Sequence, residues 1–408
     1  MFENLVNQEA KSYLIQDIKS HSLPGAILFS GTEASGKLTA ALETARILSC
    51  HNSPQGKWLC ECPSCMQHKA LVCSNLLLMG PRDCSLEIAA AYKTFIEAYK
   101  NNASHIIGAR YLFLRSVRKL TLRFNGILWE GDSKLSKIGN LIEEINENLE
   151  QLDFPRELPP LENLEKLCAE IIKTSLKLED DFLYDSIPVS QVRNMEAWAH
   201  IKSEEGRKTV IIENAERMQV SVRNALLKIL EEPPEDVVFI LLTSKRNAIM
   251  ETILSRVRTY NFVSRTVEQQ QDVIKRVFHN MDFSGSIYDY LLTYLPVSPS
   301  DIKTQARSFY QAIGSRQIPN NDEIVKKCGN FNPRIELRLF LSAIASQMKP
   351  LLYSQKGSEA AAKAMELLRK CQDNINLYNQ NPNAALDVLL RDMAALNKNY
   401  GGVFCAAM

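Results

Sequence analysis

Long apolar runs, a strong charge of one sign and an apolar signal core near the start are all missing from the sequence. No run approaches the roughly 18 apolar residues that a membrane-spanning helix needs, so we expect no membrane partner. Lys and Arg number 48 against 47 Asp and Glu, a net charge of +1, so nucleic-acid contact would have to come from local basic patches. The opening residues, MFENLVNQEAKSYL, carry no export signal. We therefore expect a cytoplasmic protein.

What the sequence does contain is enough apolar material for packed domains. Hydrophobic residues make up 45% of the 408 residues, a length that suits two to four domains. Ten cysteines are present, but a reducing compartment keeps thiols free, so we expect no disulfides. Four of them, Cys50, Cys60, Cys62 and Cys65, crowd together early in the chain. This clustering predicts a metal site rather than four unrelated buried thiols.

The apolar pattern alternates between strands and helices in two separate parts of the chain. In the first part, AILFSG and NLLLMG are predicted strands, with a helix after Lys37. From 186 to 263 the alternation returns, as KTVIIENA and DVVFILLTS flank a helix that Pro233 stops. Strand, helix and strand at this spacing predict a parallel sheet with helices on its faces. Residues 85–185, and nearly everything after Phe262, have helical patterns.

The stretch FSGTEASGKLT, residues 29–39, matches a phosphate-binding loop at Gly31, Gly36 and Lys37. In such a loop the next residue is Ser or Thr, whose hydroxyl holds Mg²⁺, and here it is Leu38. Thr39 comes one residue late, about 100° around the helix, so we expect it to point away from a metal. A strand-to-helix turn that merely needs glycines is the alternative. The lysine and the glycines leave binding of ATP or ADP without hydrolysis open.

The acidic end of the strand in TVIIENAERM is the second nucleotide-site feature. A working ATPase of this kind has Asp-Glu there, with Asp organising Mg²⁺ and Glu polarising the attacking water. The pair here is Glu213-Asn214. Glu213 keeps a carboxylate able to reach a metal, whereas Asn214 cannot act as a base. The alternative is that both residues merely cap the next helix. Because Leu38 and Asn214 are separate defects, they favour a degenerate nucleotide-binding fold.

The four clustered cysteines have the chemistry of a closed metal site. Cys62-x-x-Cys65 is the tight knuckle in which two thiolates share one ion, and Cys50 and Cys60 complete a tetrahedral set. With four protein ligands no position is left for a substrate, so the prediction is structural zinc.

Two basic features leave alternatives open. Arg256, in ILSRVRTYNF, is either a surface residue or an arginine finger that neutralises transition-state charge on a neighbour's nucleotide. The stretch ARYLFLRSVRKLTLRF mixes basic and aromatic residues in a way that suits contact with nucleic acid. We favour the simpler interpretation, an amphipathic helix with a solvated basic face.

Three blocks together are more specific than any one of them: GAILFSGTEASGKLTAALETARILSC, the cysteine cluster, and VIIENAERMQVSVRNALLKILEEPPEDVVFILLTS followed by ILSRVRTYNF. In this order they resemble the bacterial DNA polymerase III clamp loader, an AAA+ assembly that opens the sliding clamp and places it on primed DNA. The stretch NALLKILEEPP, followed by a strand and LSR, is the most recognisable part. The resemblance covers about 1–80 and 186–262 and leaves 85–185 outside.

The resemblance also implies which kind of subunit this is. Motor subunits keep Ser or Thr after the lysine and Asp-Glu at the strand end, so Leu38 and Asn214 make the chain most like delta-prime. Such a subunit positions its neighbours and would supply Arg256 in trans, although the Cys that usually follows this Arg is Val257 here. Thr243 falls at the family's sensor-1 position. The cysteine cluster resembles the family's zinc module, with Cys60 and Cys62 one residue closer than usual.

The implied fold is an α/β AAA+ phosphate-loop core, a parallel sheet with flanking helices. It is expected at 1–84 and 186–263, with a zinc module at 50–65, a helical insertion at 85–185, a small helical lid at 264–316 and an all-helical collar for oligomerisation at 317–408. The implied partners are motor and clamp-opening subunits in a hetero-oligomeric ring, which bring the sliding clamp and primer-template DNA. Two alternatives stay open: an ATP-hydrolysing motor subunit, and a zinc-dependent nucleic-acid-binding protein.

Overall fold

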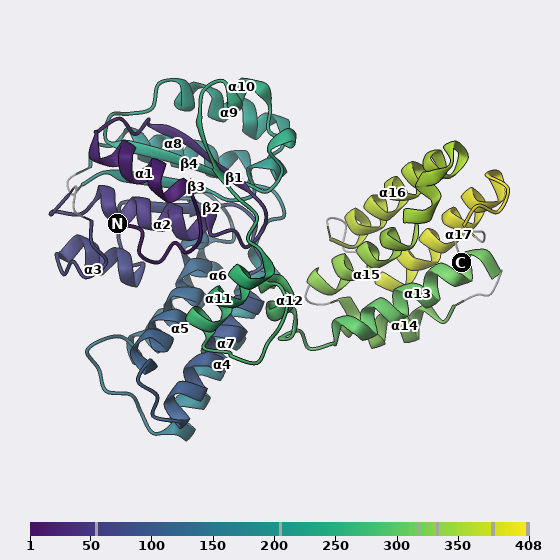
Figure 1. Ribbon diagram of the computed structural model, residues 1–408, viewed down its shortest axis with the longest axis horizontal. Helices are drawn as coiled ribbons and strands as arrows, with labels where there is room; N and C mark the ends of the chain where they lie inside the picture. Colours follow the sequence, from purple (N-terminus) through teal and green to yellow (C-terminus); the bar gives the residue numbers. More distant parts are fainter. Residues whose placement is uncertain (54–55, 204–205, 316–318, 332–333, 377–379, 405–408) are drawn as a thin grey trace. The chain divides into compact units, whose positions relative to one another are not determined.

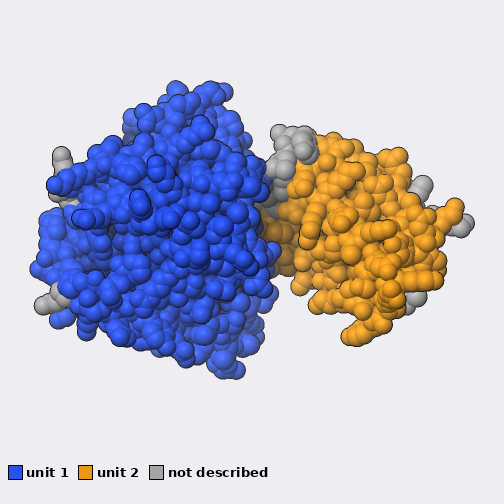
Figure 2. Space-filling model, turned by 90° about the horizontal axis from the view of Figure 1, so that it is seen from above, with its two compact units in different colours: residues 1–291 blue, residues 292–408 orange. Residues whose placement is uncertain are grey.

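The computed structural model describes the chain except residues 54–55, 204–205, 316–318, 332–333, 377–379 and 405–408. The chain forms two compact units, residues 1–291 and 292–408, which Figure 2 distinguishes by colour. Within the described residues, no helix combines the length and the apolar character needed to cross a membrane.

A five-stranded sheet forms the centre of the first unit (Figure 1). Its strands are β1 (Ala26–Gly31), β2 (Leu76–Met79), β3 (Lys208–Ile212), β4 (Val237–Thr243) and β5 (Arg258–Phe262). They lie in the order β2-β3-β4-β1-β5 and every pairing is parallel, so the predicted parallel sheet is confirmed. Because all strands run the same way, the residues that follow them meet at one edge of the sheet.

The sheet is covered on both faces, because successive strand residues point to opposite sides. Val237, Phe239 and Leu241 of β4 belong to one hydrophobic core, whereas Val238 and Ile240 belong to the other. A sheet buried on both faces needs apolar residues at every strand position, which is why β4 reads as an unbroken apolar run.

Different helices cover the two faces (Figure 1). The core that contains Val238 is covered by α1 (Ala10–Lys19) and α2 (Lys37–Leu48). The core that contains Phe239 is covered by α4 (Ser85–Lys100), α5 (Ile106–Thr121), α6 (Leu135–Glu150), α7 (Leu161–Phe182), α8 (Val189–His200), α9 (Val220–Glu231) and α10 (Glu251–Leu254). The predicted helical segment 85–185 thus shares one continuous core with the sheet. The remaining elements are α3 (Pro63–Ala70), α11 (Val267–Phe278), α12 (Ile287–Leu292) and the short turns η1 (Leu122–Phe124), η2 (Ala215–Arg217) and η3 (Arg246–Ala248).

The second unit is helical, as predicted for the C-terminal region. It contains α13 (Pro299–Ser315), α14 (Asn321–Lys327), η4 (Gly329–Phe331), α15 (Arg334–Gln347), η5 (Lys349–Tyr353), α16 (Gln355–Asn376) and α17 (Pro382–Asn399). Its core includes Phe309 of α13, Phe340 of α15 and Leu386 of α17. Helix α13, which falls in the segment assigned to a lid, therefore shares a core with the segment assigned to a collar.

Candidate functional site

The predicted phosphate loop connects β1 to α2 at the carboxyl edge of the sheet. Gly31 passes so close to β5 that a side chain there would meet the Phe262 carbonyl oxygen at 2.2 Å. Gly36 precedes α2 with φ 94°, a left-handed conformation that glycine adopts without strain. Lys37 Nζ donates to the carbonyl oxygens of Gly31 at 2.7 Å and Thr32 at 2.5 Å. Burial lowers the pKa of Lys37 to about 8, although nearby carboxylates oppose the shift.

Leu38 is part of the protein core. Its side chain is 6% exposed and belongs to the same hydrophobic cluster as Phe2, Leu5 and Phe29. Thr39 is half-buried on the next position of α2. The leucine that replaces the usual hydroxyl therefore has a packing role, which ties the N-terminal segment to the first helix after the loop.

Glu213, which follows β3, is held by two arginines. Arg82 Nη1 donates to Oε1 at 2.8 Å, and Arg123 Nη2 donates to Oε2. Burial by itself raises the pKa of this carboxyl, but the two guanidinium groups outweigh burial, so the pKa of Glu213 is lowered. The sequence predicts that Glu213 could reach a metal. In the structure, both oxygens of this carboxylate are paired with arginines of the same chain.

The pair of arginines belongs to a larger ionic network. Arg82 Nη2 also donates to Glu87 at 2.8 Å, and Lys119 donates to the other oxygen of Glu87. These cations hold the pKa of Glu87 down to about 2 against the effect of its burial. Arg82 follows β2, whereas Lys119 lies at the end of α5 and Arg123 lies in η1, so the network joins the sheet edge to segment 85–185. Sequence reasoning missed it, because no local pattern pairs residues about 90 positions apart.

Two other predicted residues of the nucleotide site are also engaged within the chain. Asn214 has φ 50° and ψ 48°, a left-handed conformation that Asn tolerates, and its Nδ2 donates to the Pro81 carbonyl. Thr243, at the end of β4, donates through Oγ1 to Glu216 at 2.8 Å, and Ser244 donates to the other oxygen of Glu216 at 2.8 Å. Glu216 was not predicted, although it stands only three residues after Glu213.

Arg256 lies on the surface just after α10. Its Nε and Nη2 donate to Glu231 Oε2 at 3.1 and 2.8 Å, and its Nη1 donates to the Thr252 carbonyl at 2.8 Å. The arginine side chain is 28% exposed and that of Glu231 is 58% exposed. Its guanidinium is therefore accessible and at the same time oriented by its own chain.

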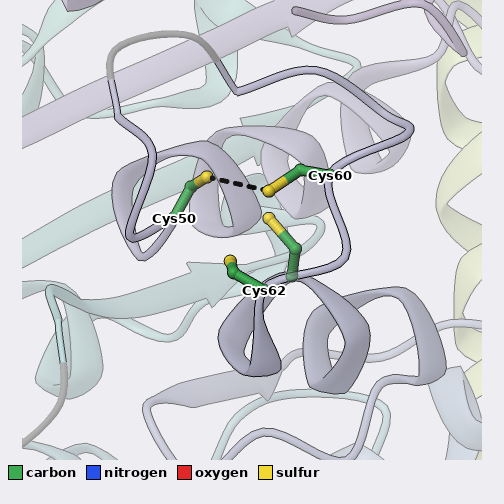
Figure 3. Close-up of side chains that lie close together, drawn as sticks. Cys50, Cys60 and Cys62 are labelled. Carbon is green, nitrogen blue, oxygen red and sulfur yellow. Dashed lines mark hydrogen bonds between the residues drawn. The ribbon is translucent and has the colours of Figure 1, made fainter.

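The structure brings Cys50, Cys60, Cys62 and Cys65 together, with all four sulfurs within 4.8 Å of one another. Figure 3 shows Cys50, Cys60 and Cys62 converging on one point. Tetrahedral zinc with Zn–S bonds of about 2.3 Å places its sulfurs about 3.8 Å apart, and Cys50 and Cys60 are 3.7 Å apart. The one-residue gap between Cys60 and Cys62 is thus compatible with a four-sulfur metal site.

Arg46 of α2 approaches this cluster from the protein interior. Its Nη1 lies 3.4 Å from Cys65 Sγ, and its Nη2 donates to Glu43 at 3.0 Å. Four thiolates around a dication carry a net charge of −2, so a buried guanidinium beside one sulfur offsets part of that charge. Sequence reasoning missed this contact; the available signal was an arginine within the apolar helix pattern that follows Lys37.

The predicted solvated basic face of ARYLFLRSVRKLTLRF is wrong. Arg110 and Arg118 of α5 and Arg123 of η1 are all less than one-tenth exposed. Arg110 donates to the Leu152 and Asp153 carbonyls, and Arg118 pairs with the Asp153 carboxylate. Carbonyl and carboxylate oxygens inside the fold therefore satisfy these donors, which a sequence alone cannot distinguish from solvated ones.

The sequence profile of the DNA polymerase III, delta subunit, family matches residues 6–122 and 160–266, more than half of the chain. The chain belongs to this family. The predicted membership of the bacterial clamp-loader family is thereby confirmed. The match includes 85–122 and 160–185, so the prediction that all of 85–185 lies outside the resemblance is wrong. The first of the two matched segments ends at residue 122, one residue before Arg123.

Curated relatives of this delta-family chain are similar over a shorter stretch. DNA polymerase III subunit delta' of Pseudomonas aeruginosa is 40% identical over 80 residues, which are 19% of this chain and 24% of that protein. Subunit delta' of Bacillus subtilis is 35% identical over 78 residues, again 19% and 24%. The chain thus aligns with about a quarter of the length of these relatives. A solved DNA polymerase III gamma subunit-related protein of Thermotoga maritima matches 57% of this chain and 90% of its own at 17% identity, with a TM-score of 0.26.

Proposed function

We propose that this chain is a non-motor, delta-prime-like subunit of the replicative clamp loader. It helps to load the sliding clamp onto primed DNA and supplies Arg256 to the ATP of a neighbouring motor subunit. The observation that carries the proposal is the state of Glu213, whose two oxygens are paired with Arg82 and Arg123. A carboxylate in this state has no free oxygen with which to organise a metal.

The other features of the sheet edge support the same proposal. Leu38 is in the core and offers no hydroxyl, and Asn214 offers no carboxylate. Loss of the metal ligand and of the water-positioning group each removes orders of magnitude of rate in phosphoryl transfer. ATP or ADP could still be held by Gly31, Gly36 and Lys37 without being hydrolysed. The alternative of a motor subunit requires Glu213 to leave a buried network.

Zinc at Cys50, Cys60, Cys62 and Cys65 is a structural cofactor in this proposal. The fit of the sulfur spacing to a tetrahedral ion supports it. The ion would offset half of the thiolate charge and hold Cys50, Cys60, Cys62 and Cys65 together, while the chain's own residues carry the functional contacts. The alternative of a zinc-dependent nucleic-acid-binding protein loses support because the arginines of α5 are buried.

The proposal assigns the partners and the domains as well. The lid is assigned to 264–316, with α13 packing in the core of the second unit, and the collar to 317–408. The collar would join motor and clamp-opening subunits in a cytoplasmic hetero-oligomeric ring. The clamp and primer-template DNA are contacted through that complex. The similarity to delta' subunits of DNA polymerase III supports the choice of complex.

The deciding experiment is reconstitution of the loader with the motor and clamp-opening subunits of the same organism. Arg256→Ala should leave assembly intact and lower ATP turnover by about 10³-fold at the site that it serves, the lower end for an arginine finger. Arg193→Ala, which removes another exposed arginine from α8, is the matched control. Unchanged turnover in Arg256→Ala, or ATP hydrolysis by the isolated chain that Lys37→Ala abolishes, would overturn the proposal.

A further inference from the structure

The guanidinium of Arg256 is fixed by contacts from two directions. Nε and Nη2 both donate to the same carboxylate oxygen of Glu231, at 3.1 and 2.8 Å. From the other side, Nη1 donates to the Thr252 carbonyl at 2.8 Å. One edge of the planar group is therefore occupied by a carboxylate and one end by a backbone carbonyl, so the plane is held against rotation.

The backbone of Glu231 lies at a packed position of the fold, although its side chain is 58% exposed. It is the last residue of α9, and the chain then turns through Pro233. Pro233 lies against the start of β1, where a side chain at Gly25 would meet its Cγ at 2.5 Å. The carboxylate is thus carried by a helix end packed against the sheet, while the arginine it holds lies on the short segment after α10.

The same contacts leave a donor for an external ligand. A guanidinium has five N–H donors, and Nη2 carries two of them. One Nη2 hydrogen is directed to Glu231, and the other is directed away from the Nε edge. Among the described residues, Glu231 is the one acceptor recorded for Nη2, and the side chain is 28% exposed, so an oxygen from outside the molecule can approach the guanidinium.

We propose that Glu231 is a positioning residue that holds Arg256 in the orientation in which it meets the phosphate of a neighbouring subunit; this inference rests on the proposed function. A long side chain that is already oriented loses less rotational freedom when the phosphate arrives, which favours the transition state. The acid therefore acts through the arginine and touches no substrate itself.

The test uses the reconstituted loader with Glu231→Ala, Arg256→Ala and the double variant. If Glu231→Ala removes from the transition state the free energy of one exposed ion pair, kcat should fall by about two- to fivefold. KM for ATP should be unchanged. In the Arg256→Ala background, Glu231→Ala should have no further effect. A purely structural acid would lower turnover in both backgrounds. Glu232→Ala removes the same charge one residue along and is the control.

The outcomes separate the two claims. If Arg256→Ala lowers turnover while Glu231→Ala equals the Glu232→Ala control, the positioning role is overturned and the proposed function stands. A rise in kcat for Glu231→Ala would mean that the acid restrains the arginine, which also overturns the positioning role. If Arg256→Ala itself changes nothing, the proposed function and this inference fail together. Melting curves of each variant check that the first unit stays folded.

Discussion

Replacing Arg123 by Met tests the buried network around Glu213. The Arg123 side chain is 1% exposed, and Met keeps much of its length while removing the charge. Breaking a buried ion pair from one side costs about 3–5 kcal/mol, because the remaining charge is left without its partner. Glu213 retains Arg82 at 2.8 Å, so we expect the lower end, about 3 kcal/mol of unfolding free energy. For a unit of this size the loss corresponds to a fall in Tm of about 6 °C.

The assay follows from the position of the tryptophans. Trp58, Trp129 and Trp198 are the three tryptophans of the chain, and all lie in the first unit, so their fluorescence during urea unfolding reports on that unit alone. Arg276→Met is the matched control. It removes an exposed arginine of the same unit, paired with Asp272 and 64% exposed, so the destabilisation should be below about 1 kcal/mol.

The same variant predicts a dependence on pH. The folded pKa of Glu213 is lowered, so the stability it contributes is present above the ordinary carboxyl pKa and is lost as pH falls through the folded value. Without Arg123 the pKa of Glu213 rises. The loss of unfolding free energy in Arg123→Met, relative to wild type, is therefore largest at neutral pH and shrinks below about pH 4. Adding Glu213→Gln should restore most of the loss at pH 7. An unfolding free energy within about 0.5 kcal/mol of wild type at pH 7 would refute the reasoning.

Two further predictions concern the metal and a second buried acid. Purified protein should contain about one zinc per chain, and Cys62→Ser should lower that content; metal analysis that finds no zinc in the folded wild type contradicts the site. Glu179 accepts the Cys84 N–H at 3.1 Å, and burial, together with the nearby Asp83 carboxylate, raises the pKa of Glu179 to about 8. The folded state keeps a proton that the unfolded state loses, so wild-type stability falls as pH rises from the ordinary carboxyl value to about 8. Glu179→Gln should remove this dependence of stability on pH. The variant should be more stable than wild type by about 1–3 kcal/mol at pH 8 and about equally stable at pH 4, as measured by tryptophan fluorescence during unfolding.

The features that could be predicted from sequence are those with a local signature. The predicted strand AILFSG is β1, residue for residue, and β4 was predicted from its apolar run. Two strands of unmistakable apolar character and the helix between them were enough to predict parallel pairing. The four cysteines were found because the sequence already places them close together.

The features that escaped prediction depend on contacts between distant residues. β5, with the sequence RTYNF, has only two fully buried residues, so its apolar pattern is too weak to mark it as a strand. Arg82 and Arg123 reach Glu213 only because β2, β3 and η1 come together in the fold. Charged residues of α5 were taken as solvated because their acceptors, such as the Leu152 carbonyl, lie on other segments.

The ionic network at the sheet edge also constrains how this chain can evolve. Changing Leu38 to Thr would supply a hydroxyl, but Glu213 would still be paired with two guanidinium groups. Removing Arg123 first would leave a buried carboxylate underpaired and the first unit less stable. Each single step back toward a metal-binding edge therefore gains nothing or costs stability. A metal-binding edge would therefore require at least two coordinated substitutions in this chain, one at Leu38 and one in the arginine network around Glu213.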